Sequence, residues 1–113
     1  MNFGWVPFWA QTMDHEWELQ RAWTELPLAS RPSACLGRNV FVTGLDDAVG
    51  YDLMRAGAPG LVEAAMFSTD YPHSATLWPR SRQHIEALTR GMRAGDRHKV
   101  LAGNAARVYG FDA

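Results

Sequence analysis

The opening stretch of the chain carries large apolar residues at regular helical spacing. Four of them follow one another at steps of four residues: Trp5, Trp9, Met13 and Trp17. Residues four apart lie on the same side of an α-helix, so the pattern predicts an amphipathic helix over Trp5–Leu26, with Pro7 tolerated in its first turn. So heavy an aromatic stripe is usually buried in a core or meets another part of a fold, and stacking on a cofactor is a less common use.

Two short apolar runs predict β-strands. The first, Asn39–Thr43, is apolar on both faces, which is typical of a parallel strand covered on both sides. The second, Val62–Phe67, contains Glu63 as its one charged residue. The stretch between Leu28 and Gly37 has prolines and serines without periodicity, so it predicts a loop that leads into the first strand.

Three further helices are predicted around these strands. One covers Ala48–Ala56. The next starts with Pro79 in its first turn and carries apolar residues at i, i+3 and i+7: Ile85, Leu88 and Met92. Asp96 can cap a last helix, beyond which Tyr109 and Phe111 are expected to pack back on the fold.

The resulting order is helix, strand, helix, strand, helix, helix, which is the alternation of an α/β fold. A (β/α)₈ TIM barrel takes about 250 residues, and two βα units are about a quarter of its eight. We therefore expect a partial barrel with two parallel strands and flanking helices. At 113 residues, the chain is expected to form a single domain over 1–113 with no second domain.

Charge and composition narrow the possible partners. Eleven Lys plus Arg residues against 12 Asp plus Glu give a net charge of -1, so there is no basic field to favour nucleic acid. The hydrophobic share of 47% supports a packed core. No apolar run approaches the roughly 18 residues of a membrane span, and a secretory signal is not evident. With Cys35 as its one cysteine, the chain is expected to be cytoplasmic, without nucleic-acid or membrane partners.

Carboxylates follow both predicted strands. Asp46 and Asp47 come after the first strand, and Asp70 comes after the second. In parallel α/β proteins, ligands and catalytic residues gather at this end of the strands. For Asp46 and Asp47 we favour a structural interpretation, the N-cap of the following helix. Asp70 has no helix directly after it, and a catalytic role stands evenly against an Asx-turn held by Tyr71–Pro72.

Other side chains could support a site at Asp70. His73 lies three residues further on, and we treat His73, Tyr71 and Asp46 as candidates for contacting a substrate or supporting Asp70. The other histidines lie in predicted helices among charged or polar neighbours, where a solvated position is expected: His15, His84 and His98. The sequence has no HxH, HExxH or CxxC spacing, so it lacks a complete metal-binding set.

Four stretches of the sequence together resemble one enzyme family. They are FSTDYPHSATLWPRSR (67–82), DRHKVLAGNAARVYGF (96–111), GWVPFWAQTMDHEWE (4–18) and RPSACLGRNVFVTGLDDAVG (31–50). They resemble the C-terminal end of the amidohydrolase-related metal-dependent hydrolases, which include hydrolases and nonoxidative decarboxylases such as aminocarboxymuconate-semialdehyde decarboxylase. The resemblance runs from about Gly4 to Phe111 and implies strands seven and eight of a (β/α)₈ barrel.

The resemblance also implies roles for individual residues. Asp70 matches the family's strand-eight aspartate, which binds the metal or handles a proton on metal-bound water. A carboxylate suits both tasks with zinc or manganese. Tyr71, Pro72 and His73 match the loop over the site. A closing helical motif, which we interpret as structural, is matched by Asn104, Ala105 and Arg107.

Two departures from the family pattern stand out. The family's metal ligands after strand one and its histidines on strands five and six have no counterpart in this sequence. Where the family usually has the run P-S-E-Y, this sequence has Ser33-Ala34-Cys35. Where the family usually has T-F-x-D-D, this sequence begins with Thr43-Gly44-Leu45.

These observations predict part of an enzyme that activates water at a divalent metal to hydrolyse or decarboxylate a small carboxylic or aromatic substrate. The chain alone is expected to be inactive, because one carboxylate cannot hold a metal that needs about three protein ligands. Activity would then require a homo-oligomer or a complementing chain that supplies strands one to six. The alternative is a non-enzymatic α/β module whose strand edges and tryptophan-rich helix mediate oligomerisation or partner binding.

Overall fold

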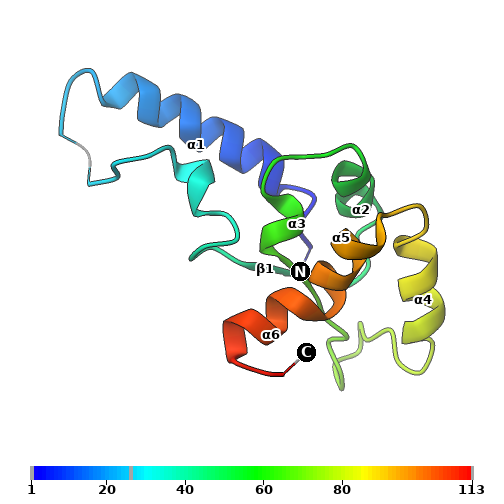
Figure 1. Ribbon diagram of the computed structural model, residues 1–113. Helices are drawn as coiled ribbons and strands as arrows, with labels where there is room; N and C mark the ends of the chain where they lie inside the picture. Colours follow the sequence, from blue (N-terminus) through cyan, green and yellow to red (C-terminus); the bar gives the residue numbers. More distant parts are fainter. Residues whose placement is uncertain (1, 26, 113) are drawn as a thin grey trace.

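The computed structural model describes residues 2–25 and 27–112 (Figure 1). Its elements in chain order are α1 (Val6–Gln20), the 3₁₀ turn η1 (Pro32–Cys35), β1 (Val42–Gly44), α2 (Ala48–Arg55), α3 (Leu61–Ala64), β2 (Ala65–Phe67), α4 (Ser81–Leu88), α5 (Ala94–His98), the π turn η2 (Lys99–Gly103) and α6 (Asn104–Tyr109). Within these residues, no helix has the length and apolar character needed to cross a membrane.

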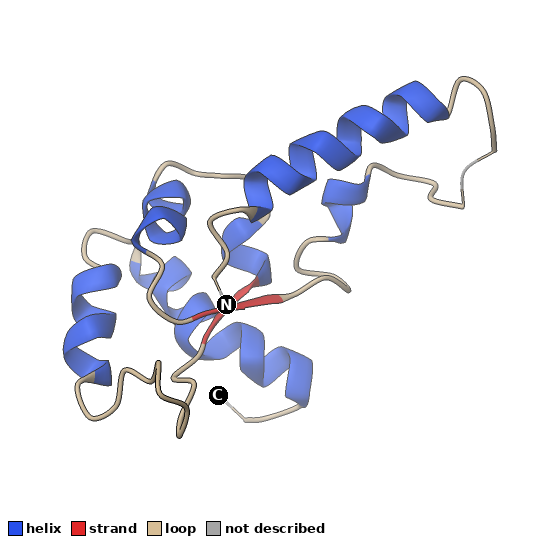
Figure 2. Ribbon diagram, turned by 180° about the vertical axis from the view of Figure 1, so that it is seen from behind, coloured by secondary structure: helices blue, strands red, loops and turns tan. Residues whose placement is uncertain are grey.

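The sheet consists of β1 and β2, which pair in parallel with Val42 opposite Ala65 and Gly44 opposite Phe67. Figure 2 shows both strands at the centre of the molecule with helices around them. The amide of Ser68 donates to the carbonyl of Gly44 at 2.9 Å and extends the pairing one residue beyond β2. The prediction of an α/β fold with two parallel strands and flanking helices is confirmed, and the arrangement is that of part of a (β/α)₈ barrel.

The core gathers around residues from both ends of the chain. Its largest fully buried side chains come from four separate segments: Phe3 and Val6 from the N-terminal stretch, Tyr51 from α2, Leu61 from α3 and Val100 from η2. The rings of Phe3 and Tyr51 meet edge to face, with centroids 5.4 Å apart. The N-terminal segment is therefore packed against α2.

The predicted tryptophan ridge is not the buried side of α1. An α-helix turns about 100° per residue, so each step of four advances roughly 40° around the axis and the ridge winds from one face to another. Trp5 is 54% exposed, whereas Trp9 is half-buried. The residues of α1 that are buried are Val6 and Ala10. The stripe therefore follows the boundary of the core-facing side: Trp9 packs against the core and Trp17 Nε1 donates to the Leu28 carbonyl at 3.2 Å, so these rings meet other parts of the fold without being fully buried.

Helix α1 ends at Gln20 rather than continuing to Leu26, which lies outside the described residues. From there the chain turns back, and η1 runs beside α1 in a region that extends away from the rest of the molecule (Figure 1). Asp14 joins the two segments, since its carboxylate accepts from the Ser33 amide at 2.8 Å and from the Ser33 hydroxyl at 2.6 Å. The prediction of an irregular loop over Leu28–Gly37 missed this 3₁₀ turn.

Both strands are shorter than predicted. The first begins at Val42 rather than Asn39. The first half of the second apolar run forms α3, which starts after Gly60 in the left-handed conformation (φ 72°), and the strand proper is Ala65–Phe67. A short apolar run fits a buried helical turn as well as a strand, so periodicity alone could not separate the two.

Three predictions for the C-terminal half were also wrong. Pro79 precedes the N-cap of α4, because that helix starts at Ser81. Asp96 lies within the first turn of α5 and accepts from Arg93 Nε at 3.0 Å, so it does not cap the helix. Tyr109 and Phe111 are exposed and stack on each other, with ring centroids 5.9 Å apart, instead of packing back on the core.

Candidate functional site

The carboxyl ends of β1 and β2 border a small pocket. It measures about 70 Å³ and is lined by Thr43 of β1, by Leu45 just after β1, and by Ser68 and Asp70, which follow β2. Parallel strands present their carboxyl ends at the same edge of a sheet, which explains why residues so distant in sequence meet here. Asp70, predicted as the principal site residue, lies in this pocket.

The backbone at Asp70 adopts the left-handed conformation, with φ 54°. This conformation is uncommon outside glycine, and Asp is among the residues that tolerate it. The Asp70 amide faces the Ser68 hydroxyl oxygen at 3.3 Å, and the Asp70 carbonyl accepts from the His73 amide at 2.8 Å. The turn is thus closed by the main chain. In the described part of the chain no backbone N–H donates to the Asp70 carboxylate, so the Asx-turn alternative is not the one adopted.

His73 is the side chain that the turn brings to Asp70. Its Nδ1 lies 3.3 Å from Asp70 Oδ2, and both side chains are open to solvent, at 68% and 40% exposure. When Nδ1 carries a proton it can donate to the carboxylate. In this geometry Nδ1 also accepts from the Ala75 amide at 3.4 Å, so a protonated Nδ1 would exchange that contact for one with the Asp70 carboxylate.

Tyr71 projects into solvent at 64% exposure. Its ring packs edge to face on Trp78, with centroids 5.8 Å apart. The loop is closed by Thr76, whose hydroxyl donates to the Thr69 carbonyl at 2.7 Å and faces the Trp78 amide nitrogen at 3.2 Å. The sequence reasoning singled out neither Trp78 nor Thr76. The available signal was weak: threonine hydroxyls often bond to nearby backbone groups in turns.

Asp46 and Asp47 have different roles. Asp46 is exposed and does not line the pocket, and its carbonyl accepts from Asn2 Nδ2 at 3.3 Å. The Asp47 carboxylate is buried and caps α2 by accepting from the Gly50 amide at 2.9 Å. The structural interpretation of Asp47 is confirmed, whereas Asp46 does not cap the helix.

Asp47 also binds the N-terminal segment. Its second oxygen, Oδ2, accepts from the amides of Phe3 at 2.6 Å and Gly4 at 2.7 Å. Burial, and to a lesser extent the negative charge of Asp47, raises the pKa of the Tyr51 hydroxyl from 10.0 to about 12. In this region Asp47 is a structural acid.

The described residues do not make a metal centre by themselves. They contain no group of three or more His, Cys, Asp or Glu side chains placed to hold one ion. Asp70 and His73 offer two adjacent donors, whereas zinc sites use at least three protein ligands. A complete centre would need further donors from elsewhere.

The model of the amidohydrolase family matches residues 3–111. No curated protein matches the chain. The matched range includes both strands, the pocket at their carboxyl ends and every helix described above. The chain belongs to the amidohydrolase family.

Proposed function

We propose that this chain forms the strand-seven and strand-eight part of a metal-dependent amidohydrolase-family barrel, with Asp70 as its catalytic acid–base group. The observation that carries the proposal is the position of the Asp70 carboxylate at the carboxyl ends of the strands, free of backbone hydrogen bonds from the described residues and 3.3 Å from His73 Nδ1. A carboxylate so placed can take a proton from water at Oδ2 and share it with the imidazole.

Zinc or manganese belongs to this proposal as the family's metal, with Asp70 as one ligand. The remaining ligands would come from the part of the barrel that holds strands one to six. The substrate would be a small carboxylic or aromatic compound that undergoes hydrolysis or nonoxidative decarboxylation. His73, and Tyr71 beside it, would contact that substrate or support Asp70, and the chain by itself would be inactive.

A chimera tests this proposal. Residues 3–111 replace the corresponding segment of an active amidohydrolase-family enzyme, and turnover and bound metal are measured. The chimera is expected to be active. Asp70→Asn should lower its kcat by about 100-fold or more, on the scale of losing an acid–base group. Glu86→Gln, which removes an exposed acid on α4 within the transplanted segment, is the control and should retain full activity. Full activity in the Asp70→Asn chimera would contradict the proposal.

A second function is favoured by the exposed side of α1. Phe8 is 74% exposed and Leu19 is 49% exposed, and both lie on the opposite side of the helix from Val6 and Ala10. This surface fits a non-enzymatic module for oligomerisation or partner binding. A discrete dimer by size-exclusion chromatography that becomes monomeric in Phe8→Ser would support it. A monomer in both forms would contradict oligomerisation through this surface.

A further inference from the structure

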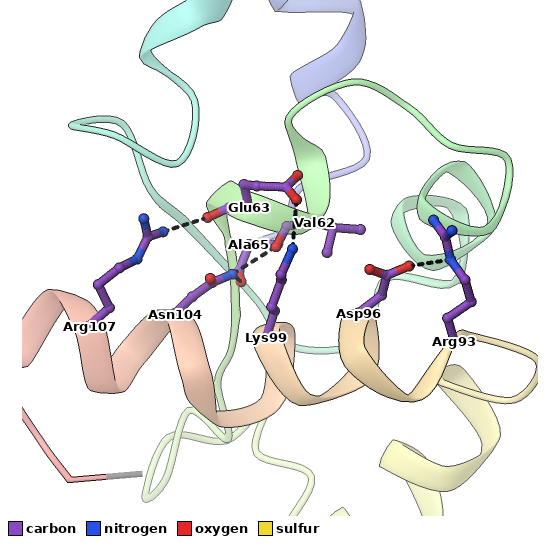
Figure 3. Close-up of polar contacts among 8 residues, drawn as sticks. All are labelled: Val62, Glu63, Ala65, Arg93, Asp96, Lys99, Asn104 and Arg107. Atoms are coloured by element: carbon purple, nitrogen blue, oxygen red, sulfur yellow. Dashed lines mark hydrogen bonds and ion pairs between the residues drawn. The ribbon is translucent and has the colours of Figure 1, made fainter.

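Side chains of α6 bind three backbone carbonyls at the junction where α3 passes into β2 (Figure 3). Asn104 Nδ2 donates to the carbonyl of Val62 at 2.7 Å and to that of Ala65 at 2.8 Å. Arg107 Nη2 donates to the Glu63 carbonyl between them at 3.2 Å. The junction is therefore held by donors that lie about 40 residues further along the chain.

The need for these donors follows from the length of α3. The last four carbonyls of an α-helix have no partner within the helix, and α3 is only four residues long. Asn104 is 3% exposed, so water does not compete for its two hydrogen bonds. Its carboxamide serves as a C-cap supplied from another element.

Asn104 lies on the core-facing side of the C-terminal helical segment. Helix α5, η2 and α6 follow one another without a break, and Asn104 is the first residue after the π segment. Val100, before this point, is buried, and so is Asn104 after it. Asn104 lies four residues after Val100, so the two side chains fall on the same side of the helix, and both are turned toward the core.

Strand β2 transmits the position of this junction to Asp70. The strand has three residues, and Ala65, whose carbonyl Asn104 binds, is the first of them. At its other end the Ser68 amide bonds to Gly44, and Asp70 follows two residues later. A shift of one residue along a strand moves the chain by about 3.3 Å and exchanges its two faces. The residue at which α3 ends and β2 begins therefore determines the position of Asp70 at the end of the strand.

We infer that Asn104 is a positioning residue for the Asp70–His73 pair, acting through its hydrogen bonds at the α3–β2 junction. The catalytic meaning of this role rests on the proposed function, but the geometric role does not. The motif that contains Asn104 thus does more than close the fold.

The test compares Asn104→Ala with Lys99→Ala in the full chain. Lys99 pairs with Glu63 at 3.0 Å, so the control removes an exposed contact between the same two regions. Amide hydrogen exchange is followed at Ser68, next to the site, and at Tyr51, whose amide bonds to Asp47. In Asn104→Ala, exchange at Ser68 should accelerate by about tenfold or more while Tyr51 changes by less than about twofold, the pattern of a local opening. Lys99→Ala should leave both amides unchanged.

The ring-nitrogen resonances of His73 are a second readout. They should shift in Asn104→Ala as the contact with Asp70 loosens, and stay in place in Lys99→Ala. Equal acceleration at Ser68 and Tyr51 with unmoved His73 resonances would overturn the inference, because it is the signature of a general loss of stability. If Asn104→Ala does not fold, Asn104→Ser, whose hydroxyl can still donate one bond, is compared in the same way. These readouts need no turnover, so a failure of the proposed function in the Asp70→Asn chimera remains a separate result.

Discussion

The ring of Phe3 lies against the backbone of Gly44, in the space that a side chain at position 44 would need. A Cβ built on Gly44 would overlap Cε1 and Cδ1 of Phe3, and one on Gly50 would overlap the ring's other edge. Phe3 is completely buried between them. The sequence departs from the family's T-F-x-D-D run by having Gly44 in place of phenylalanine, and an aromatic ring from the N-terminal segment fills that position.

Gly44→Ala should therefore be destabilising. The added methyl group would displace Phe3 from a packed core, and overpacking of this kind costs about 1–3 kcal/mol, with the upper end expected because the overlap is with a fully buried ring. Urea denaturation measures the change in the free energy of unfolding.

Gly95→Ala is the matched control for this change. Nothing lies within 4 Å of a Cβ at Gly95, which is in helix α5, so alanine should be neutral or stabilise the protein by up to about 1 kcal/mol. Equal stability of the two variants would contradict the tight contact between Phe3 and Gly44.

Asp47→Ala should cost about 2–4 kcal/mol, because it removes the acceptor of three backbone amides, two of them buried. Thermal and urea unfolding measure the loss. The neighbouring variant Asp46→Ala removes an exposed carboxylate of the same type and should change stability by less than about 0.5 kcal/mol. A similar loss in both variants would show that Asp47 has no special role in holding the N-terminal segment.

Tyr51 makes stability depend on alkaline pH. Its pKa is 10.0 when unfolded and about 12 when folded, so above pH 10 the unfolded chain releases this proton first. The contribution is complete below pH 10 and is lost as the pH rises towards 12, by up to about 3 kcal/mol. Urea unfolding at pH 8 to 11 measures the decline.

Tyr51→Phe is the control for that decline. The Tyr51 hydroxyl is buried and has no hydrogen-bond partner among the described residues, so its removal should be neutral or slightly stabilising at pH 8. The variant should also lose less stability than the parent above pH 10. An identical pH dependence would assign the decline to other groups.

Asp70→Asn should leave folding nearly unchanged, within about 0.5 kcal/mol, because asparagine tolerates the same left-handed backbone and the carboxylate caps no described amide. Thermal unfolding of the chain measures this directly. A loss above about 2 kcal/mol would indicate a structural role and count against its assignment to chemistry.

The sequence was most informative where the cause of a structure is local. The cap at Asp47 depends on amides within three residues, and the turn after β2 depends on the residues around Asp70, so both regions could be located in advance. Long-range contacts were out of reach. Phe3 and Gly44 are distant in sequence, and no periodicity links them. The π turn at Lys99–Gly103 was equally hidden, because π turns are rare and the residues there carry no distinctive pattern. The tryptophan stripe misled because steps of four drift around a helix.

The sheet described here has two strands, so neither is an interior strand. Each strand has one side bonded to its neighbour and another whose amides and carbonyls have no partner within the sheet. These unpaired backbone groups can bind a further strand. If the correct segment is present, the sheet grows in an ordered way, and if it is absent, other chains pair there and aggregate. A low protein concentration should therefore reduce aggregation. Co-expression with a segment that pairs with these strand edges should do the same and raise the yield of soluble protein.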